Sequence, residues 1–366
     1  MPLETPLLDL HRSAHAQIGE YFGTLLPSRL GDFAAEYSAA REAVALVDTN
    51  FRAFFSFSGP DAQRYVNAVL TSNVRDLKPG QGAVGLFLTP QGHILDEIET
   101  LALEGSILAV SHAMARERTY STFDKFIIMD DVTLEDQTPT TGSLDLVGPR
   151  AADLISELSG VNLAETPELS HLEIMLGSIP CRAVHHKFGG HSAAMLIIAR
   201  EHLALLWRQM EAHVRENGGA AVGMEAINSI RLEYGIPWFG SDYDEKNIPH
   251  EAGLEHSHIS YEKGCYTGQE IVERVRSRGH ANRRLTSLQF LAAQAPAAGT
   301  KLIAPGNAPT SEVGHVTSAA FSPALQRPIG LGYVRRENAA IGTRLDAAGV
   351  AAEVIAPPLL ANGSHA

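Results

Sequence analysis

Residues 263–270 bring together several side chains that could do chemistry. The stretch supplies an ammonium, a thiol, a phenol, a hydroxyl, an amide and a carboxylate, from Lys263, Gly264, Cys265, Tyr266, Thr267, Gly268, Gln269 and Glu270. Thr267 and Glu270 have capping-box spacing, which predicts that a helix begins here. Cys265 would then precede a helix N-terminus, where the helix dipole favours an anion. With the Lys263 charge nearby, the pattern predicts a reactive thiolate.

A purely structural interpretation of the same stretch stays open. Gly264 and Gly268 allow the backbone to turn sharply. Free cysteines are also often buried and unreactive. On this view the stretch is a glycine-punctuated loop with a buried thiol.

The segment Lys263–Glu270 resembles the signature of the YgfZ proteins, which are folate-binding factors that support maturation or repair of iron–sulfur enzymes. These proteins belong to the aminomethyltransferase superfamily, whose founding member is the T-protein of the glycine cleavage system. The resemblance extends from Thr5 to about Ile355. It implies tetrahydrofolate, or a folate derivative, as the cofactor, and iron–sulfur client or assembly proteins as partners.

The elements that must position this segment follow from hydrophobic periodicity and turn residues. Helical spacing is seen at residues 36–46, 201–217 and 223–232, and strand patterns at 51–57, 83–89 and 93–103. The same pattern, a strand followed by a Gly-Pro turn and a helix, occurs at residues 51–70 and again at 144–158. Two copies predict two similar α+β lobes rather than a repeat array.

Short strands separated by Gly and Pro turns follow Leu285, a pattern typical of a small β-barrel. The predicted fold class is therefore α+β: two similar lobes in an aminomethyltransferase-like domain, plus a C-terminal barrel. The predicted boundaries are residues 1–285 for the folate-binding domain, with lobes at roughly 48–140 and 141–222, residues 286–357 for the barrel, and 358–366 for a flexible tail.

The resemblance also implies which residues contact folate. Asp96, in Gly92-His93-Ile94-Leu95-Asp96-Glu97, occupies the position of the T-protein catalytic aspartate. The segment around Arg231 and Glu233 is similar to the T-protein Arg-Leu-Glu-x-Gly segment, and a carboxylate suits the edge of a pterin. Tyr266 and Gln269 complete the predicted contacts. The alternatives are an exposed carboxylate on an edge strand for Asp96 and a local ion pair for Arg231 and Glu233.

Two stretches depart from the T-protein pattern. The T-protein Gly-Glu-Asp-Gly segment, which supplies a pterin-binding carboxylate, corresponds to residues 187–192, which contain no acid. The Ser-His-Met-Gly run corresponds to Thr49-Asn50-Phe51-Arg52. Both changes weaken the prediction of glycine-cleavage chemistry.

Composition limits the partners and the compartment. A net charge of −13 argues against a stable nucleic-acid complex or binding to an anionic membrane. Neither a targeting segment nor a long apolar run is evident, and the two cysteines are far apart in sequence. We therefore expect a cytoplasmic monomer. The histidine pairs lack the spacing of a structural metal site, so no metal is predicted.

Three functions remain open at this stage. The first is a YgfZ-like factor in which Asp96, Arg231 and Glu233 help to hold folate while Cys265, assisted by Lys263, acts at the rim. The second is a tetrahydrofolate-dependent aminomethyltransferase in which Asp96 is catalytic. The third is a non-catalytic module that only docks a partner. Whether the protein is an enzyme is left undecided.

Overall fold

The computed structural model describes residues 1–305, 312–357 and 359. They form two compact units, each assembled from separate stretches of the chain. Unit 1 contains Met1–Leu88, Leu95–Ile227 and His258–Thr267, and unit 2 contains Thr89–Ile94, Asn228–Ser257 and Gly268–Ala366. The predicted boundary at residue 285 falls inside unit 2. The predicted tail lies, except for Leu359, outside the described residues.

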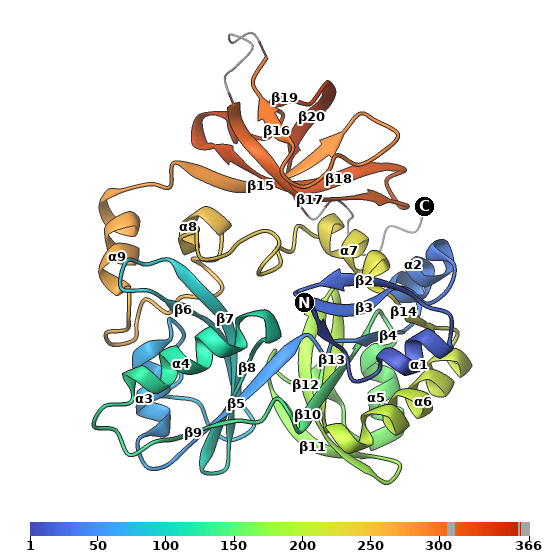
Figure 1. Ribbon diagram of the computed structural model, residues 1–366, viewed down its shortest axis with the longest axis vertical. Helices are drawn as coiled ribbons and strands as arrows, with labels where there is room; N and C mark the ends of the chain where they lie inside the picture. The colour runs from blue at the N-terminus through green and yellow to red at the C-terminus, as the bar shows by residue number, and fades with distance from the viewer. Residues whose placement is uncertain (306–311, 358, 360–366) are drawn as a thin grey trace. The chain divides into compact units, whose positions relative to one another are not determined.

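The first lobe of unit 1 is a five-stranded sheet with two helices on one face (Figure 1). Its strand order is β6 (Gly82–Leu88), β7 (Ile94–Leu103), β8 (Ser106–His112), β5 (Arg52–Ser58) and β9 (Thr133–Asp136). Apolar side chains of β5, β7 and β8 pack against α3 (Ala62–Val69) and α4 (Arg116–Phe126). Strand β7 is hydrogen-bonded on both sides, so the interpretation of Asp96 as an exposed residue of an edge strand is wrong.

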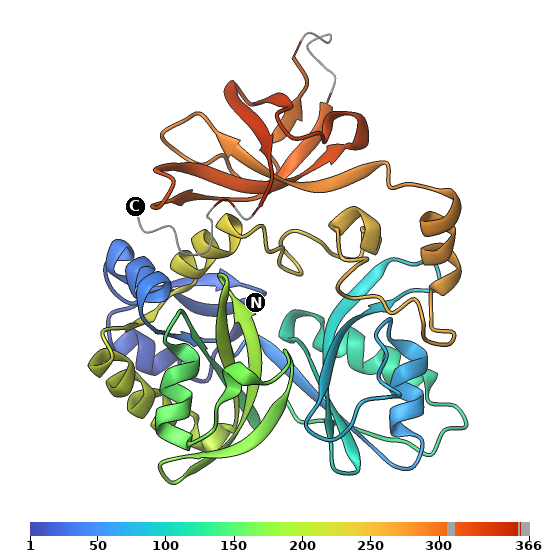
Figure 2. The same ribbon diagram turned by 180° about the vertical axis from the view of Figure 1, so that it is seen from behind.

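The second lobe is a six-stranded sheet that Figure 2 shows from behind. Its strand order is β11 (His171–Leu176), β12 (Ile179–Phe188), β13 (His191–Ala199), β10 (Thr141–Val147), β4 (Ala45–Asp48) and β14 (Ala220–Val222). Helices α5 (Ala151–Ser159) and α6 (Arg200–Glu216) cover one face through an apolar stripe that includes Trp207. Strand β4 belongs to this sheet although it precedes the first lobe in sequence.

Two glycines in equivalent positions confirm that the strand–turn–helix pattern is repeated in the two lobes. Gly59 and Gly148 follow strands β5 and β10 and have φ angles of 106° and 105°. A Cβ on Gly59 would lie 2.4 Å from the Asp131 carbonyl oxygen, and one on Gly148 would lie 2.8 Å from two carbonyl oxygens. Only glycine satisfies both the left-handed backbone and this close approach. The predicted fold of two similar lobes is confirmed.

The N-terminal segment forms a small sheet of unit 1 that the sequence did not predict. Strand β3 (Thr24–Arg29) lies between β1 (Leu3–Glu4) and β2 (Gln17–Tyr21), and α1 (Leu8–Ser13) precedes β2. The buried Asp48 carboxylate accepts hydrogen bonds from Thr5 Oγ1 at 2.7 Å and contacts His11 Nε2 at 2.8 Å. These bonds attach the segment to the end of β4.

Helix α2 (Phe33–Glu42) begins and ends earlier than predicted. The expected helix reached Leu46, whereas the chain turns at Ala43 and residues 45–48 form β4. Val44, Ala45, Leu46 and Val47 are all buried. A run of β-branched and aliphatic residues inside a sheet is apolar on both faces, so helical spacing and a buried strand cannot be told apart there by periodicity.

Unit 2 contains the predicted barrel. It is closed by β15 (Arg283–Phe290), β18 (Arg327–Arg335), β17 (Glu312–Ser322), β16 (Lys301–Ile303), β19 (Arg344–Ala347) and β20 (Val350–Ile355). Apolar side chains such as Leu288, Phe290 and Val354 fill its interior. Helices α7 (Met224–Glu233), α8 (Pro249–Ala252) and α9 (Gln269–Arg278) precede it. None of the helices in the described part of the chain combines the length and the hydrophobicity that a membrane-spanning helix requires.

Candidate functional site

Polar side chains from both lobes meet above an apolar layer in unit 1. In that layer Phe54, Leu101, Leu108 and Val110 of the first sheet pack against Val184, Met195 and Ile197 of the second. Because side chains alternate along a strand, polar residues two or four positions away lie on the same two sheet faces as this layer. We call these residues the interlobe polar cluster: Arg52, Glu97, Glu99 and His112 from the first sheet, and Asp145 and His186 from the second.

Arg52 and Asp145 form a two-point ion pair between the lobes. Arg52 Nη1 donates to Asp145 Oδ1 at 2.8 Å and Nη2 donates to Oδ2 at 3.0 Å. Burial tends to lower the pKa of the guanidinium, but Asp145 together with Glu99 and Glu97 outweighs it, and the Arg52 pKa is raised. The planar guanidinium of arginine matches a carboxylate in this two-point geometry, so the pair links the first sheet to the second.

Glu99 and His186 make a second bridge, with Oε2 and Nε2 3.3 Å apart. Burial favours the neutral Glu99 carboxyl, but His186 and Arg52 outweigh it and lower the Glu99 pKa to about 2. For His186, burial opposes the charged form, while Glu99 and Asp145 favour it, so its pKa is raised. The pair is therefore an imidazolium and a carboxylate at mildly acidic pH.

Asp96 lies on the opposite face of β7, fully buried beneath α4. Its carboxylate accepts hydrogen bonds from Ser111 Oγ, from Thr119 Oγ1 at 2.7 Å and from the Glu97 N–H at 2.9 Å. His112 Nδ1 lies 3.2 Å from Asp96 Oδ1. The carboxylate thus has no exposed surface, and His112 is the group that links it to the interlobe polar cluster.

The Glu97 side chain lies on the other face of β7, within the interlobe polar cluster. Its Oε2 atom lies 3.1 Å from Nε2 of His258, which belongs to the last stretch of unit 1. The two side chains are 23% and 13% exposed, so they remain accessible to a small molecule. The adjacent acids of the Asp96–Glu97 dipeptide therefore play different parts, because successive side chains of a strand point to opposite faces.

The Lys263 ammonium is not aimed at a thiol. It donates to the carbonyl oxygens of Asn67, Leu70 and Ser72, the last two at 2.6 and 2.7 Å. These carbonyls end and follow helix α3, where a cation is favoured. Burial lowers the Lys263 pKa to about 8. This geometry gives Lys263 a structural role in unit 1.

The other residues of the 263–270 stretch divide between solvent and core. Cys265 is exposed, so the interpretation as a buried thiol is wrong. Tyr266 is buried, with its ring 5.4 Å from the Lys263 ammonium. A helix begins within this stretch as predicted, but α9 starts at Gln269, and its N-cap is Gly268, which has φ 83° and makes no side-chain capping bond. The predicted capping box of Thr267 and Glu270 is therefore wrong.

Arg231 and Glu233 are buried inside unit 2. Arg231 Nη1 pairs with Asp242 at 2.5 Å, and the guanidinium lies 4.2 Å from the centre of the Trp238 ring. Glu233 accepts a hydrogen bond from Ser322 of the barrel strand β17. The carboxylate that pairs with Arg231 is thus Asp242 rather than Glu233. Since neither is exposed, the geometry gives no support to the prediction that they contact folate.

Sequence matches agree with this architecture. Residues 7–260 match the model of the GCVT N-terminal domain, and residues 283–360 match the glycine cleavage T-protein C-terminal barrel domain. The chain belongs to the GCVT family. The interlobe polar cluster lies within the part matched by the N-terminal GCVT model.

Curated GCVT relatives cover nearly the whole chain. The aminomethyltransferase of Rubrobacter xylanophilus is 27% identical over 91% of this chain and 87% of its own length. The aminomethyltransferase of Desulforamulus reducens is 26% identical over 93% of this chain and 92% of its length. The solved structure of glycine cleavage system aminomethyltransferase T from Bartonella henselae has a TM-score of 0.85 and 22% identity, covering 98% of both chains. This last match supports the fold.

Most of the interlobe polar cluster was missed at the level of sequence. From the sequence, Glu97 stood out only as the neighbour of Asp96, and Arg52 only as part of a departure from a family motif. Strand alternation was the available signal: Glu97 and Glu99 lie on the same face of β7 as Leu101, and Arg52 lies on the same face of β5 as Phe54. The pairings with Asp145 and His186 had no local signal, since the partners are distant in sequence.

Proposed function

We propose that this protein is a tetrahydrofolate-dependent one-carbon transferase of the aminomethyltransferase type. Membership of the GCVT family and the names of its relatives support the class. The single observation that carries the proposal is the interlobe polar cluster, with its Asp96–His112 contact at 3.2 Å. It combines carboxylates, imidazoles and an arginine at the junction of two sheets, which suits proton transfer to and from an amine.

The side chains around the cluster fit a folate. Glu97 and Glu99 lie two residues apart on one face of β7, and their side chains are 23% and 20% exposed. They can accept hydrogen bonds from the N–H groups on the edge of a pterin. Phe22 and Phe51 stack 4.1 Å apart, and His112 lies about 6 Å from both rings. Flat rings of this kind suit a planar heterocycle.

When bound, tetrahydrofolate supplies the nitrogen that accepts the one-carbon unit. His112 is placed to move a proton: hydrogen bonding of Nδ1 to the Asp96 carboxylate leaves Nε2 as the basic atom. Asp96 then acts by holding the imidazole in that tautomer. Glu97, Glu99 and Asp145 favour a cationic amine nearby by Coulomb attraction, and Arg52 offsets part of their charge.

The test is a turnover assay of the purified protein with aminomethyl donors and tetrahydrofolate. We expect His112→Ala and Asp96→Asn to lower kcat by about 10²- to 10⁴-fold, the usual contribution of a positioned acid–base group. Cys265→Ser should leave turnover unchanged. Absence of turnover in the wild-type protein with every donor, or full activity of His112→Ala, would reject the proposal.

Folate binding is tested separately by a thermal-shift titration with tetrahydrofolate. A ligand at 100 times its Kd stabilises the folded state by about 2.7 kcal/mol. We expect Glu97→Gln to weaken this stabilisation, whereas a change of the exposed Glu104 on the β7–β8 turn should not. A wild-type protein that shows no shift would contradict the ligand assignment.

Cys265 favours a second function, YgfZ-like support of iron–sulfur enzymes in the cytoplasm. Its thiol is exposed and lies in the segment that resembles the YgfZ signature. Iron–sulfur client or assembly proteins would then be the partners of a monomeric protein. In cells, Cys265→Ser should lower the activity of an iron–sulfur enzyme while Asp96→Asn leaves it unchanged. The opposite pattern favours the transferase.

A further inference from the structure

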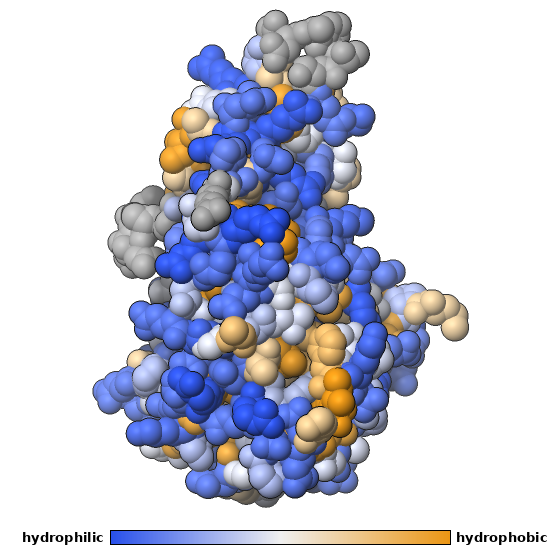
Figure 3. Space-filling model, turned by 90° about the vertical axis from the view of Figure 1, so that its left-hand side faces the viewer, coloured by the Kyte–Doolittle hydropathy of each residue, from blue (hydrophilic) through white to orange (hydrophobic). Residues whose placement is uncertain are grey.

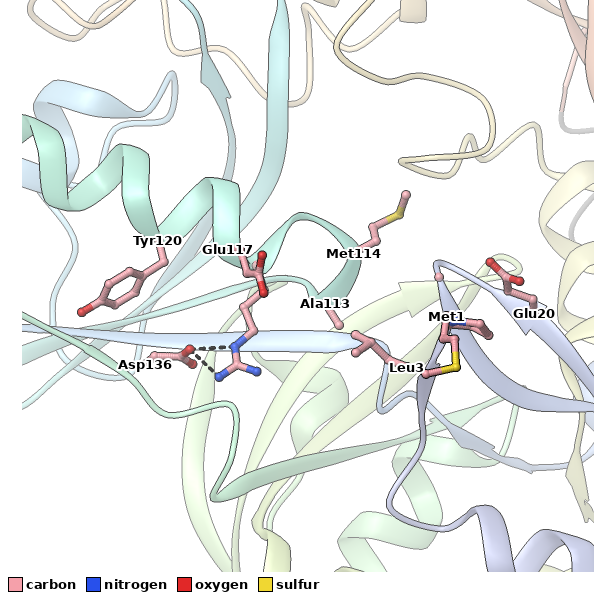
Figure 4. A pocket seen from close by; sticks show the side chains of 11 residues that line it. Met1, Leu3, Glu20, Ala113, Met114, Glu117, Tyr120 and Asp136 are labelled. Atoms are coloured by element: carbon pink, nitrogen blue, oxygen red, sulfur yellow. Dashed lines mark hydrogen bonds and ion pairs between the residues drawn. The ribbon is translucent and has the colours of Figure 1, made fainter.

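A groove of about 860 Å³ lies in unit 1 between the N-terminal sheet and the start of helix α4 (Figure 4). Its apolar side chains are those of Met1, Leu3 and Met114, and its acidic side chains are those of Glu20, Glu117 and Asp136. None of these residues belongs to the interlobe polar cluster. We refer to this feature as the N-terminal groove.

The apolar side chains of the N-terminal groove are unusually open to solvent. Leu3 and Met114 are each 47% exposed, and Met1 is fully exposed. On the face of the molecule seen in Figure 3, hydrophilic residues cover most of the surface and apolar side chains gather in limited areas. Apolar residues that adjoin one another in a concave, polar-rimmed surface mark interaction sites more often than isolated ones do.

The charge of the groove is negative. Asp136 is neutralised by Arg116, whose Nε donates to it at 2.6 Å. Among the described residues, Glu20 and Glu117 have no ion-pair partner. Even with the α-amino group of Met1 counted, the carboxylates outnumber the cations. The whole chain carries −13, so the groove adds a local acidic rim to an acidic molecule.

One wall of the groove is preformed by a tight turn between β2 and β3. Phe22 and Gly23 have φ angles of 53° and 69°, and Phe22 stacks on Phe51 at 4.1 Å. A Cβ on Gly23 would lie 3.2 Å from Met114 Cβ, so the turn is close to the opposite wall. A wall held this firmly loses little conformational freedom when a partner binds.

We propose that the N-terminal groove docks a segment of a partner protein that presents apolar side chains flanked by lysine or arginine. The apolar side chains would pack against Leu3 and Met114, and the cations would lie beside Glu20 and Glu117. Rim charges of this kind steer association, while the apolar contacts limit dissociation. The inference is independent of the proposed one-carbon chemistry.

The first experiment uses a defined probe, the labelled peptide acetyl-Lys-Leu-Lys-Phe-Lys-amide, and measures fluorescence anisotropy with the full chain. We expect saturable one-to-one binding that weakens with added salt, because the rim charges are exposed. A peptide with glutamate in place of lysine, and one with serine in place of leucine and phenylalanine, should each bind at least tenfold more weakly. Equal binding of either analogue, or no binding of the probe, overturns the proposal.

The second experiment locates the site. The double variant E20K/E117K should weaken binding at least tenfold, and Met114→Ser about fivefold. The control E104K/E168K changes two exposed carboxylates elsewhere in unit 1 and alters the net charge by the same amount. It should stay within twofold of the wild-type protein. An equal loss in the control would show attraction to the acidic molecule as a whole and would overturn the docking site.

Discussion

Unit 1 and unit 2 each contain an ion pair between an arginine and an aspartate, and the two pairs differ in how completely they are enclosed. In unit 1, Arg52 and Asp145 are 13% and 20% exposed and stand beside two histidines. In unit 2, Arg231 and Asp242 are 1% and 0% exposed. The family resemblance predicted Arg231 as a folate contact. The enclosure of Arg231 gives that prediction no support, because the guanidinium is already paired inside unit 2.

The partners of Asp242 show why its pair with Arg231 is structural. Oδ2 also accepts the Trp238 N–H at 2.9 Å, and Oδ1 accepts Thr317 and Ser318 hydroxyl groups at 2.6 Å each. The hydrogen-bonding capacity of the carboxylate is thus used to attach the loop after α7 to barrel strand β17. A fully enclosed and satisfied pair has nothing left to offer a ligand.

Removing the enclosed pair should have the largest effect. We expect Arg231→Ala to lower the free energy of unfolding by about 3 to 5 kcal/mol, because it leaves the Asp242 charge buried without its partner. The measurement is chemical denaturation followed by a barrel-sensitive probe. Arg52→Ala, at the partly exposed pair, is the matched comparison and should cost less. Equal losses would remove the distinction between the two pairs.

Lys263 offers an intermediate case within the 263–270 stretch. We expect Lys263→Met to cost about 2 to 3 kcal/mol, because three carbonyl groups around the end of α3 lose a charged donor. Cys265→Ser, two residues away and exposed, should change stability by less than about 0.5 kcal/mol. Both changes in the free energy of unfolding are to be measured by the same chemical denaturation assay. A Lys263→Met protein as stable as Cys265→Ser would show that the ammonium does not hold the helix end.

The smallest expected effect is a pH dependence of stability. It should be found for the Glu99–His186 bridge of unit 1 but not for the Arg231–Asp242 pair of unit 2. The raised His186 pKa gives stability that is present below about pH 6.5 and lost as pH rises through its folded value. The lowered Glu99 pKa gives stability that is present above about pH 4.5 and lost as pH falls toward 2. The bridge between them is therefore strongest between about pH 4.5 and 6.5.

This pH dependence is measured by comparing the wild-type protein with Glu99→Gln. We expect the difference in unfolding free energy to be about 1 to 2 kcal/mol larger at pH 5.5 than at pH 8. Asp242→Asn in unit 2 should lower stability by an amount that is constant across this range, since an Arg–Asp pair contains no histidine. A pH-independent difference for Glu99→Gln would show that His186 does not share its charge with Glu99.

Local patterns predicted the elements better than the contacts between them. Gly and Pro turns separated the barrel strands correctly, and the apolar stripe through Trp207 defined α6 within a residue at each end. Helical spacing predicts residues 45 and 46 as the end of a helix, whereas they belong to strand β4, because a doubly buried strand lacks alternation. Residues 3–29 form a short helix and small strands that no sequence pattern predicted.

The site was harder to predict because it depends on pairing between sheets. Asp96 was chosen from the Asp96–Glu97 dipeptide by family resemblance, whereas strand parity places Glu97 on the interlobe face and Asp96 beneath α4. The Arg52–Asp145 pair spans 93 residues, and no local rule connects its members. The capping box failed for a local reason, since Gly268 adopts the left-handed backbone at the N-cap itself.

Strand β4 has a consequence for how the polypeptide matures on the ribosome. Its residues 45–48 pair with β10 and with β14 at residues 220–222, whereas all five strands of the first lobe come from residues 52–136. The first lobe can therefore complete its sheet while the nascent chain is still short. Residues 45–48 must wait, with one edge unsatisfied, until β14 has emerged, so a fragment that ends before residue 220 leaves the second sheet unfinished.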